Sequence, residues 1–485
     1  MDLTISKKNE VNLKVIAEPH VHQELSDYFT FEVPGFKYLQ RQRRYRKWDG
    51  KIRLYSPGTG ELYVGLSNYL IDWCQENCYD YTFEPSERFG LPLEENPLIT
   101  PEAVGQFVNS LSLPVKMRDY QYRGVYECLR YNRRLLLSPT ASGKSLMIYS
   151  LVRFHVNVER KILIVVPTTT LVEQMHKDFE SYGWKASYYC HKIYAGQEKT
   201  SEKDVIITTW QSVYKQPVNW FKRFDVVIGD EAHLFKAKSL TQLMSKLHLC
   251  KYRIGFTGTL DGSETNQLVL EGLFGRCSQV TKTKDLMERQ QVADLKVKVL
   301  VLKHEFQAFE SYQDEMEYIV SHEQRNNFIM RLAKDLTGNT LVLFNYVERH
   351  GIPLYDLLNS NVAHPVHLVH GGVDIDDREE IRSLTEESDN SIIVASYGTF
   401  STGINIKNLH NVIFASPSKS RVRNLQSIGR VLRKGDNKSQ ATLYDIADDI
   451  SRNSFRNYTL NHLIERVKVY NEEQFDYEII DVKLR

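Results

Sequence analysis

A Gly-Lys-Ser triplet at residues 143–145 has the residue types and the setting needed to hold a triphosphate. It lies in "LLLSPTASGKSLMIY", where an aliphatic run predicts a strand and the residues after Gly143 predict a helix. Backbone N–H groups at such a helix start would face the phosphates, Lys144 would reach the β- and γ-phosphates, and Ser145 could hold Mg²⁺. The GxxxxGK[ST] pattern is incomplete, because its first position is Ser138. The triplet alone therefore leaves an accidental match open.

Two adjacent carboxylates, Asp230 and Glu231, follow a second apolar run in "FDVVIGDEAH". A carboxylate at the end of a strand beside a phosphate loop is placed to hold Mg²⁺, and the next carboxylate is placed to polarise the attacking water. The alternative is a helix N-terminus, where the helix dipole favours acidic residues. That alternative explains one acid but not the order of the pair after Lys144. The three side chains together predict ATP hydrolysis.

Short aliphatic segments alternate with helical ones from about residue 113, and they predict the sheets that would position these side chains. The first set is "RLLLS", "KILIVVP", "DVIITT", "FDVVIGDE" and "YRIGFTGT". The pattern restarts after "TKTKDLMERQQVADL" with "LKVKVLVL", "TLVLFNY", "VHLVHGG", "SIIVASYG" and "NVIFASP". Near-continuous apolar strands between helices indicate parallel sheets covered on both faces. The predicted fold class is α/β, with two consecutive parallel-sheet domains.

A smaller domain is predicted before them. "RYRKW", "KIRLY" and "ELYVGL" are separated by turn signals and predict a β-meander, and "SNYLIDWCQEN" predicts a helix. Four prolines between residues 85 and 101 indicate a linker. The predicted organisation is a small α+β domain at 1–83, a linker at 84–112, sheet domains at 113–283 and 284–450, and a C-terminal helix and strand at 451–485 that pack on the second sheet domain.

Composition limits the class of protein. The chain has 485 residues, of which 42% are hydrophobic and 25% charged, and this is enough to bury several cores. Its apolar runs are far shorter than the roughly 20 residues that span a bilayer, and "MDLTISKKNE" contains no apolar signal core. The six cysteines show no paired CxxC spacing for zinc. We therefore expect a cytoplasmic protein without a membrane segment.

The stretch "QRQRRYRKWDGK" at residues 40–51 concentrates basic charge in one place. It carries six cationic side chains and one anionic side chain in a chain of formal net charge +1, so the rest of the chain is net acidic. Local charge of this kind is typical of a surface that binds a polyanion. The alternative is a solvated edge strand whose charges prevent edge-to-edge pairing. The remaining motifs decide between the two.

The ordered motifs resemble those of the superfamily 2 helicases over roughly residues 113 to 450. Beside the phosphate loop and "DEAH", the matching segments are "RDYQ" (118–121), "VPTTTLVEQ" (166–174), "TTWQS" (208–212), "TGT" (257–259), "LVLF" (341–344), "ASYGTFSTGINIKNLHNVI" (395–413) and "QSIGRVLR" (426–433). The family's common phosphate loop is AxTGSGKT, whereas this chain has Ser138 and Ala141 in place of Ala and Gly. A residue other than glycine at 141 restricts the choice of backbone conformation.

This resemblance implies two RecA-like motor domains that use ATP and Mg²⁺. It implies catalytic roles for Lys144, Asp230, Glu231, Arg430 and Arg433, and a metal site at Ser145 and Asp230. One of the two arginines would complete charge stabilisation when the cleft between the motor domains closes on ATP. Further nucleotide contacts are implied for Arg118, Gln121, Thr140, Ser142, Gly143, Gly403 and Gln426.

Nucleic-acid contacts are implied for Pro167, Thr168, Thr169, Thr208, Thr209, Trp210, Thr399, Ser401 and Thr402. Hydroxyls and backbone N–H groups at helix starts suit phosphates and do not read bases, so little sequence specificity is expected. The alternative for each threonine-rich loop is an ordinary helix cap.

The segment "YFTFEVPGFKYLQRQRRYRKWDGKIRLY" is similar to the amino-terminal DNA-binding region of the UvsW-like recombination helicases of T-even phages. The similarity implies that Arg41, Arg43, Arg44, Arg46, Lys47, Lys51 and Arg53 grip duplex phosphates. Tyr45 and Trp48 could stack on bases, although packing is favoured for Trp48. The implied function is ATP-dependent unwinding and branch migration of forks, displacement loops and Holliday junctions in recombination and repair, with RNA–DNA hybrids as an open further substrate. A monomer in the host cytoplasm, working with single-strand-binding or recombination proteins, is expected.

Three alternatives stay open. A DEAH-type RNA helicase shares the motor, but such enzymes usually carry long C-terminal accessory domains. A translocating restriction subunit also fits the motor, yet the first domain shows no PD…ExK nuclease pattern. A non-motor DNA-binding or annealing protein with a vestigial ATP site is disfavoured by the complete set of catalytic residues.

Overall fold

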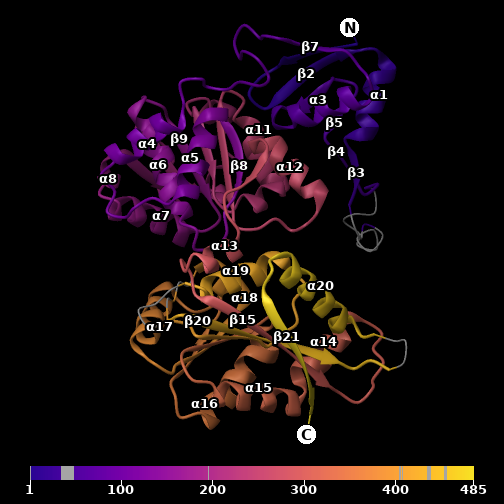
Figure 1. Cartoon of the computed structure of the whole chain (residues 1–485), viewed down its shortest axis with the longest axis vertical. Coiled ribbons are helices and arrows are strands. Elements are labelled where there is room, and N and C mark those ends of the chain that lie inside the picture. Colours follow the sequence, from indigo (N-terminus) through magenta and orange to yellow (C-terminus); the bar gives the residue numbers. More distant parts are fainter. Residues whose placement is uncertain are drawn as a thin grey trace. The chain divides into compact units, whose positions relative to one another are not determined.

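The computed structural model describes residues 2–33, 36, 48–194, 196–403, 406, 408–433, 438–452 and 456–484. The chain separates into two compact units (Figure 1). One contains Met1–Ser138 and Gly143–Val280, and the other contains Thr281–Arg485 with the four loop residues Pro139–Ser142. The two units are described in turn.

The N-terminal part of the first unit is a small α+β domain. Its five-stranded sheet has the order β5-β6-β2-β1-β7, in which β7 runs parallel to β1 and the other pairs are antiparallel. A separate antiparallel pair joins β3 to β4. The elements are β1 (Leu3–Lys7), β2 (Asn12–Ala17), α1 (Pro19–Tyr28), β3 (Thr30–Glu32), β4 (Lys51–Arg53), β5 (Tyr55–Ser56), β6 (Glu61–Tyr63), η2 (Val64–Leu66), α3 (Ser67–Glu76) and β7 (Tyr81–Glu84).

The first motor domain is a parallel seven-stranded sheet of order β10-β11-β9-β12-β13-β8-β14. Strands β9, β11 and β12 are buried along their whole length, as expected for strands covered on both faces. Its strands are β8 (Arg133–Leu137), β9 (Ile162–Val166), β10 (Cys190–Ile193), β11 (Val205–Thr209), β12 (Val226–Gly229), β13 (Tyr252–Thr257) and β14 (Cys277–Gln279). Its helices are α4 (Pro101–Ser110), α5 (Asp119–Tyr131), α6 (Lys144–Asn157), α7 (Thr169–Ser181), α8 (Ala186–Tyr189), α9 (Trp210–Val213), α10 (Val218–Phe221), η3 (Ala232–Lys236), α11 (Lys238–Lys246) and α12 (Glu264–Phe274).

The second unit has the same architecture, with a parallel seven-stranded sheet of order β17-β18-β16-β19-β20-β15-β21. Its strands are β15 (Asp294–Lys303), β16 (Thr340–Phe344), β17 (Val366–Val369), β18 (Ile392–Ser396), β19 (Asn411–Phe414), β20 (Gln440–Asp449) and β21 (Asp476–Lys483). Its helices are α13 (Thr283–Glu288), α14 (Tyr312–Ser321), α15 (Glu323–Asp335), η4 (Val347–Gly351), α16 (Ile352–Asn361), α17 (Ile375–Glu387), α18 (Tyr397–Gly403), α19 (Arg421–Val431) and α20 (Tyr458–Glu472).

The predicted fold class is confirmed: two tandem parallel-sheet domains follow a small α+β domain. The predicted meander is wrong in detail, because "KIRLY" divides between β4 and β5, which belong to different sheets. The parallel strand β7 also makes the main N-terminal sheet a mixed one. Within the described part of the chain, no helix is both long and apolar enough to cross a membrane. The exact domain limits stay a prediction.

Candidate ATP and nucleic-acid sites

The phosphate loop connects the end of β8 to the start of α6. Gly143 has φ of +82°, and a Cβ atom there would lie 2.2 Å from Nε2 of Gln121, so both the backbone and the space require glycine. Ala141 stands where the family has glycine, and it also adopts a positive φ, of +68°. Left-handed backbone costs an L-residue about 1 kcal/mol. Ala141 therefore holds a left-handed conformation at a cost that glycine would avoid.

The N-terminus of α5 lies against this loop. The backbone N–H of Arg118 donates to Oε1 of Gln121 at 2.8 Å, and Gln121 is buried. The guanidinium of Arg118 donates to the Tyr120 hydroxyl at 2.7 Å. Gln121 is thus held in one orientation beside Gly143, where the sequence predicted a nucleotide contact.

Lys144 and the two carboxylates come together at the carboxyl edge of the sheet. The Nζ atom of Lys144 lies 3.6 Å from Oε1 of Glu231, and Glu231 has a positive φ of +50°. Asp230 follows β12 directly, and its Oδ1 accepts from the Glu231 backbone N–H at 2.9 Å. Burial, and then the charge of Glu231, raise the pKa of Asp230 to about 6, while Lys144 opposes this rise. The cation and both acids therefore form one electrostatic cluster.

Strand β13 lies between β8 and β12 and connects the loops that follow them. The Thr257 carbonyl accepts from the Ser138 backbone N–H at 2.8 Å, and the Thr257 hydroxyl lies 3.0 Å from Nδ1 of His233. The same Nδ1 lies 3.4 Å from Oε2 of Glu231. Burial lowers the pKa of His233, so its ring is neutral near pH 7. Thr257 and His233 were not predicted as site residues, although both lie in motifs that the sequence revealed.

The segments after β9 and β11 lie side by side, because Val166 is paired in register with Thr209. Thr168 caps α7, its hydroxyl accepting from the Leu171 backbone N–H at 3.3 Å, with Pro167 before it and Thr169 after it. Thr208 is fully buried and donates to the Ile193 carbonyl at 2.8 Å, so its hydroxyl serves the sheet.

The Thr209 hydroxyl lies 2.9 Å from Oγ of Ser212, and the half-buried Trp210 begins α9. Pro167, Thr168, Thr169, Thr209 and Trp210 thus form one neighbourhood at this edge of the sheet.

The second unit carries the remaining motifs on α18 and α19. Thr399 is buried, and its hydroxyl accepts from that of Ser396 at 2.8 Å. The side chains of Ser401 and Thr402 and the surroundings of Gly403 lie outside the described residues. Gln426 and Arg430 lie on α19, and Arg433 follows its end.

Arg430 and Arg433 are both half-buried. The guanidinium carbon of Arg430 lies 6.0 Å from the ring centre of Phe400 on α18. The ammonium of the buried Lys438 donates to the carbonyl of Val431 and, at 3.1 Å, to that of Arg433. Lys438 thus satisfies carbonyl groups at the end of the helix that carries the arginines.

Known sequence families match all three parts of the chain. Residues 2–84 match the N-terminal domain of the DNA helicase UvsW, residues 114–262 the res subunit of type III restriction enzymes, and residues 324–435 the helicase conserved C-terminal domain. The ATP-dependent DNA helicase uvsW of Enterobacteria phage T4 is 34% identical over 512 aligned positions, which cover 100% of both chains. The chain belongs to the UvsW family of ATP-dependent DNA helicases.

The crystal structure of T4 UvsW also covers 100% of both chains, with 31% identity and a TM-score of 0.53. A more distant relative of the chain, the DNA 3'-5' translocase XPB2 of Sulfurisphaera tokodaii, is 22% identical over 375 residues, covering 68% of this chain and 83% of the relative. The predicted family and the predicted enzyme class are therefore confirmed: this UvsW-family chain is an ATP-dependent helicase that acts on DNA.

The basic stretch of this UvsW-family chain is only partly described. Arg41, Arg43, Arg44, Arg46 and Lys47 lie outside the described residues, as does Tyr45. Lys51 and Arg53 are on β4 with exposed side chains, and Arg53 pairs with Asp49 at 2.5 Å. Trp48 is half-buried, and its ring packs edge-on against Phe36 at 5.3 Å between centroids. Trp48 therefore packs at the margin of the domain and not in its core.

The residues at the phosphate loop fit a nucleotide bound with Mg²⁺. The left-handed glycine opens the start of α6 to a phosphate, and the buried, electrostatically strained Asp230 would be relieved by a cation. Among the described residues, no group of three or more His, Cys, Asp and Glu could hold a metal by itself. Mg²⁺ is usually held by one or two protein groups together with substrate phosphates, and Ser145 and Asp230 are the residues that would hold it here.

Proposed function

We propose that this helicase couples ATP hydrolysis to unwinding and branch migration of forked, displacement-loop and Holliday-type DNA in recombination and repair. The observation that carries the proposal is the convergence of Lys144, Asp230 and Glu231 at one edge of the first motor sheet. The family match over residues 2–84 supports a DNA-directed function beyond the motor itself. RNA–DNA hybrids stay a further candidate substrate.

The chemistry follows from the geometry of the three side chains. The Nζ atom of Lys144 lies 3.6 Å from Oε1 of Glu231, and a γ-phosphate would compete for the ammonium and release the carboxylate. Glu231 would then polarise the attacking water, as a general base within reach of its proton. Ser145 and Asp230 would hold Mg²⁺, which neutralises charge on the β- and γ-phosphates. The His233 ring, whose Nδ1 lies 3.4 Å from Oε2 of Glu231, would limit the rotation of the carboxylate.

Arg430 and Arg433 are proposed to act on the developing charge at the γ-phosphate. Replacing either with alanine should lower kcat by orders of magnitude and change nucleotide affinity little, because such an arginine acts mainly on the transition state. The contrary result, weaker nucleotide binding with kcat preserved, would assign them to ground-state binding.

Two surfaces are proposed for DNA. The segments Pro167–Thr169 and Thr209–Trp210, together with the start of α18 around Thr399, would hold a strand by its phosphates and give little sequence preference. The basic residues of the N-terminal domain would hold the duplex. If Arg41, Arg43 and Arg44 contact phosphates, replacing all three with alanine should flatten the slope of log K against log salt by roughly 2 to 3 units. If the salt dependence of fork binding is unchanged, the stretch at residues 40–51 is a solvated edge strand and not a DNA contact.

The experiment that tests the function compares the wild type with Lys144→Ala. ATP turnover is measured without nucleic acid, with single-stranded DNA, with branched DNA and with RNA, and fork binding is measured by fluorescence anisotropy. We expect stimulation by DNA in the wild type and loss of turnover with nearly intact DNA binding in the variant. Lys222→Ala, at an exposed lysine of the same domain, is the matched control. Stimulation by RNA alone would support the RNA-helicase alternative, and wild-type protein without turnover would support the annealing alternative.

A further inference from the structure

The N-terminal domain and the first motor domain share one apolar core. Buried side chains of the N-terminal domain, among them Leu66 and Leu70, belong to the same cluster as Leu268, Leu273 and Phe274 of the motor domain. Domains joined by a small polar interface move relative to one another by default, whereas a continuous apolar interface prevents such motion. The first unit is therefore built as a single body from two sequence domains.

The two backbones approach so closely that each contributes a glycine. A Cβ atom at Gly65 would lie 1.9 Å from the Glu271 carbonyl oxygen. A Cβ atom at Gly272 would lie 2.9 Å from Cδ2 of Tyr63. Both contacts join η2 and its neighbour Tyr63 to helix α12. A larger side chain at either glycine would push the two domains apart.

A buried carboxylate reinforces this contact. Glu271 on α12 is 2% exposed, and its Oε2 accepts from the Tyr69 hydroxyl of α3 at 2.6 Å. Its Oε1 accepts from the Cys277 backbone N–H at 2.9 Å, so the motor domain itself holds the carboxylate in place. Tyr69 therefore docks onto a preformed acceptor.

A network of ion pairs also joins the N-terminal domain to the first motor domain. Glu10 of the N-terminal domain pairs with Lys7 at 3.2 Å and with Arg133 of the motor domain, and its backbone N–H donates to the His248 carbonyl at 2.9 Å. Glu94, in the predicted linker, pairs with Lys251 at 2.5 Å. The Lys7 and Glu10 side chains are both buried, so removing one of them would leave the other charge in the interior without its partner.

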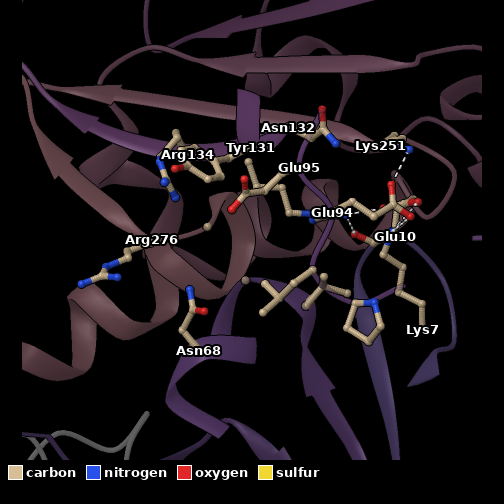
Figure 2. A pocket seen from close by; sticks show the side chains of 16 residues that line it. Lys7, Glu10, Asn68, Glu94, Glu95, Tyr131, Asn132, Arg134, Lys251 and Arg276 are labelled. Atoms are coloured by element: carbon tan, nitrogen blue, oxygen red, sulfur yellow. Dashed lines mark hydrogen bonds and ion pairs between the residues drawn. The ribbon is translucent and has the colours of Figure 1, made fainter. Parts of the chain in front are cut away.

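Figure 2 shows Lys7, Glu10, Glu94 and Lys251 gathered at one end of a cavity of about 290 Å³. Arg134, Tyr131, Asn68 and Arg276 surround the other end of the same cavity. The cavity lies along the interface between the N-terminal domain and the first motor domain, here called the seam. Ion pairs stabilise the seam at one end of the cavity. The segment that follows β7 contributes to these ion pairs, so it is not a flexible linker between the domains.

We infer that the N-terminal domain moves with the first motor domain as one rigid body, and that the contacts of Tyr69 with Glu271 and of Glu10 with Arg133 are positioning contacts for strand separation. This inference rests on the proposed DNA-binding role of the N-terminal domain. Any displacement of the first motor domain during the ATP cycle is then transmitted undiminished to the duplex that the N-terminal domain holds.

Rigidity is tested directly by electron spin resonance distances. Nitroxide labels are placed at the exposed positions His20 and Lys222 of the full chain, with Cys78 and Cys277 changed to serine so that they are not labelled. We expect one distance distribution, unchanged by a non-hydrolysable ATP analogue or by fork DNA. A second population or a shifted distance in any of these states overturns the inference.

The role of these contacts in strand separation is tested by placing a bulky side chain at the interface between the two domains. Gly272→Leu should lose fork unwinding per ATP hydrolysed and keep the ATP turnover that single-stranded DNA stimulates, and the milder Tyr69→Phe should show a smaller loss. The control is Gly105→Leu, because a Cβ atom there meets nothing within 4 Å. Unwinding at the wild-type level in a Gly272→Leu variant whose labels show a loosened seam would refute the positioning role.

Failure of the proposed function has a separate signature. If the variant lacking Arg41, Arg43 and Arg44 binds forks like the wild type, the DNA role of the N-terminal domain fails. The distance measurement still decides whether the two domains form one body.

Discussion

Replacing Asp230 with asparagine should stabilise the nucleotide-free protein while it abolishes ATP hydrolysis. The carboxyl group is buried beside Glu231, and its pKa is raised from the ordinary 3.8 to about 6. A raised carboxyl pKa means that the folded state binds the proton more tightly than the unfolded state does. The folded protein therefore loses stability as the pH rises from about 4 to about 6. Above about pH 6 the full cost of burying the ionised carboxylate is present.

The magnitude follows from the size of the shift. A difference of about two pKa units corresponds to about 3 kcal/mol at pH 7, at 1.36 kcal/mol for each unit. Asparagine retains an Oδ1 atom that can accept from the Glu231 backbone N–H, which donates to Asp230 at 2.9 Å. The variant should thus lose the buried charge without losing that hydrogen bond, and its melting temperature should rise by several degrees.

The assay is differential scanning calorimetry between pH 4 and pH 8, without nucleotide or Mg²⁺. The stability difference between variant and wild type should be largest at pH 7 and should shrink towards pH 4, because the aspartate is then protonated in the folded state and the pH approaches its ordinary pKa of 3.8. Asp72→Asn, at an exposed position on α3, is the control and should change little. The electrostatic reasoning would be refuted if the asparagine variant were no more stable than the wild type at pH 7. It would also be refuted if the difference in stability did not change with pH.

Three further predictions concern residues behind the site. Arg466→Met should destabilise the second motor domain by about 3–5 kcal/mol, because it leaves buried Asp445 without the cation at 2.8 Å; unchanged urea unfolding would contradict this. Lys438→Met should lower kcat and leave the KM for ATP unchanged in steady-state kinetics, because the carbonyl groups at the end of α19 lose the Lys438 side chain that donates to them. A change in KM alone would contradict this role of Lys438. Thr208→Val should cost about 1 kcal/mol of stability and leave single-stranded DNA affinity unchanged by anisotropy, whereas weaker binding would show a contact with DNA.

The strands that carry the site could be predicted because they are buried on both faces. Runs such as "ILIVV" and "VVIG" are apolar at every position, and their burial is continuous. Strands β1 and β2 were missed, although the alternating burial of their residues is the pattern of a strand with one buried face. The three-residue edge strand β14 has the sequence "CSQ" and offers no compositional signal. It becomes a strand only because β8 supplies a partner.

The sequence by itself determined the chemistry that is local along the chain. A Gly-Lys-Ser triplet after an apolar run, and an Asp-Glu pair after another, need only their immediate neighbours to place a lysine at a helix start and carboxylates at a strand end. Positive φ at Gly143 is local in the same sense, because glycine tolerates it and other residues resist it.

Only the tertiary structure decided which of these local features meet. Lys144 reaches Glu231 because β13 alone separates β8 from β12 in the sheet, an order that no local pattern encodes. Adjacent threonines likewise differ, since the hydroxyl of Thr208 bonds to the neighbouring strand while Thr209 contacts the start of α9. The seam at Gly65 also depends on a distant helix. Contacts between segments far apart in the chain are fixed by strand order and core packing, which involve the whole domain at once.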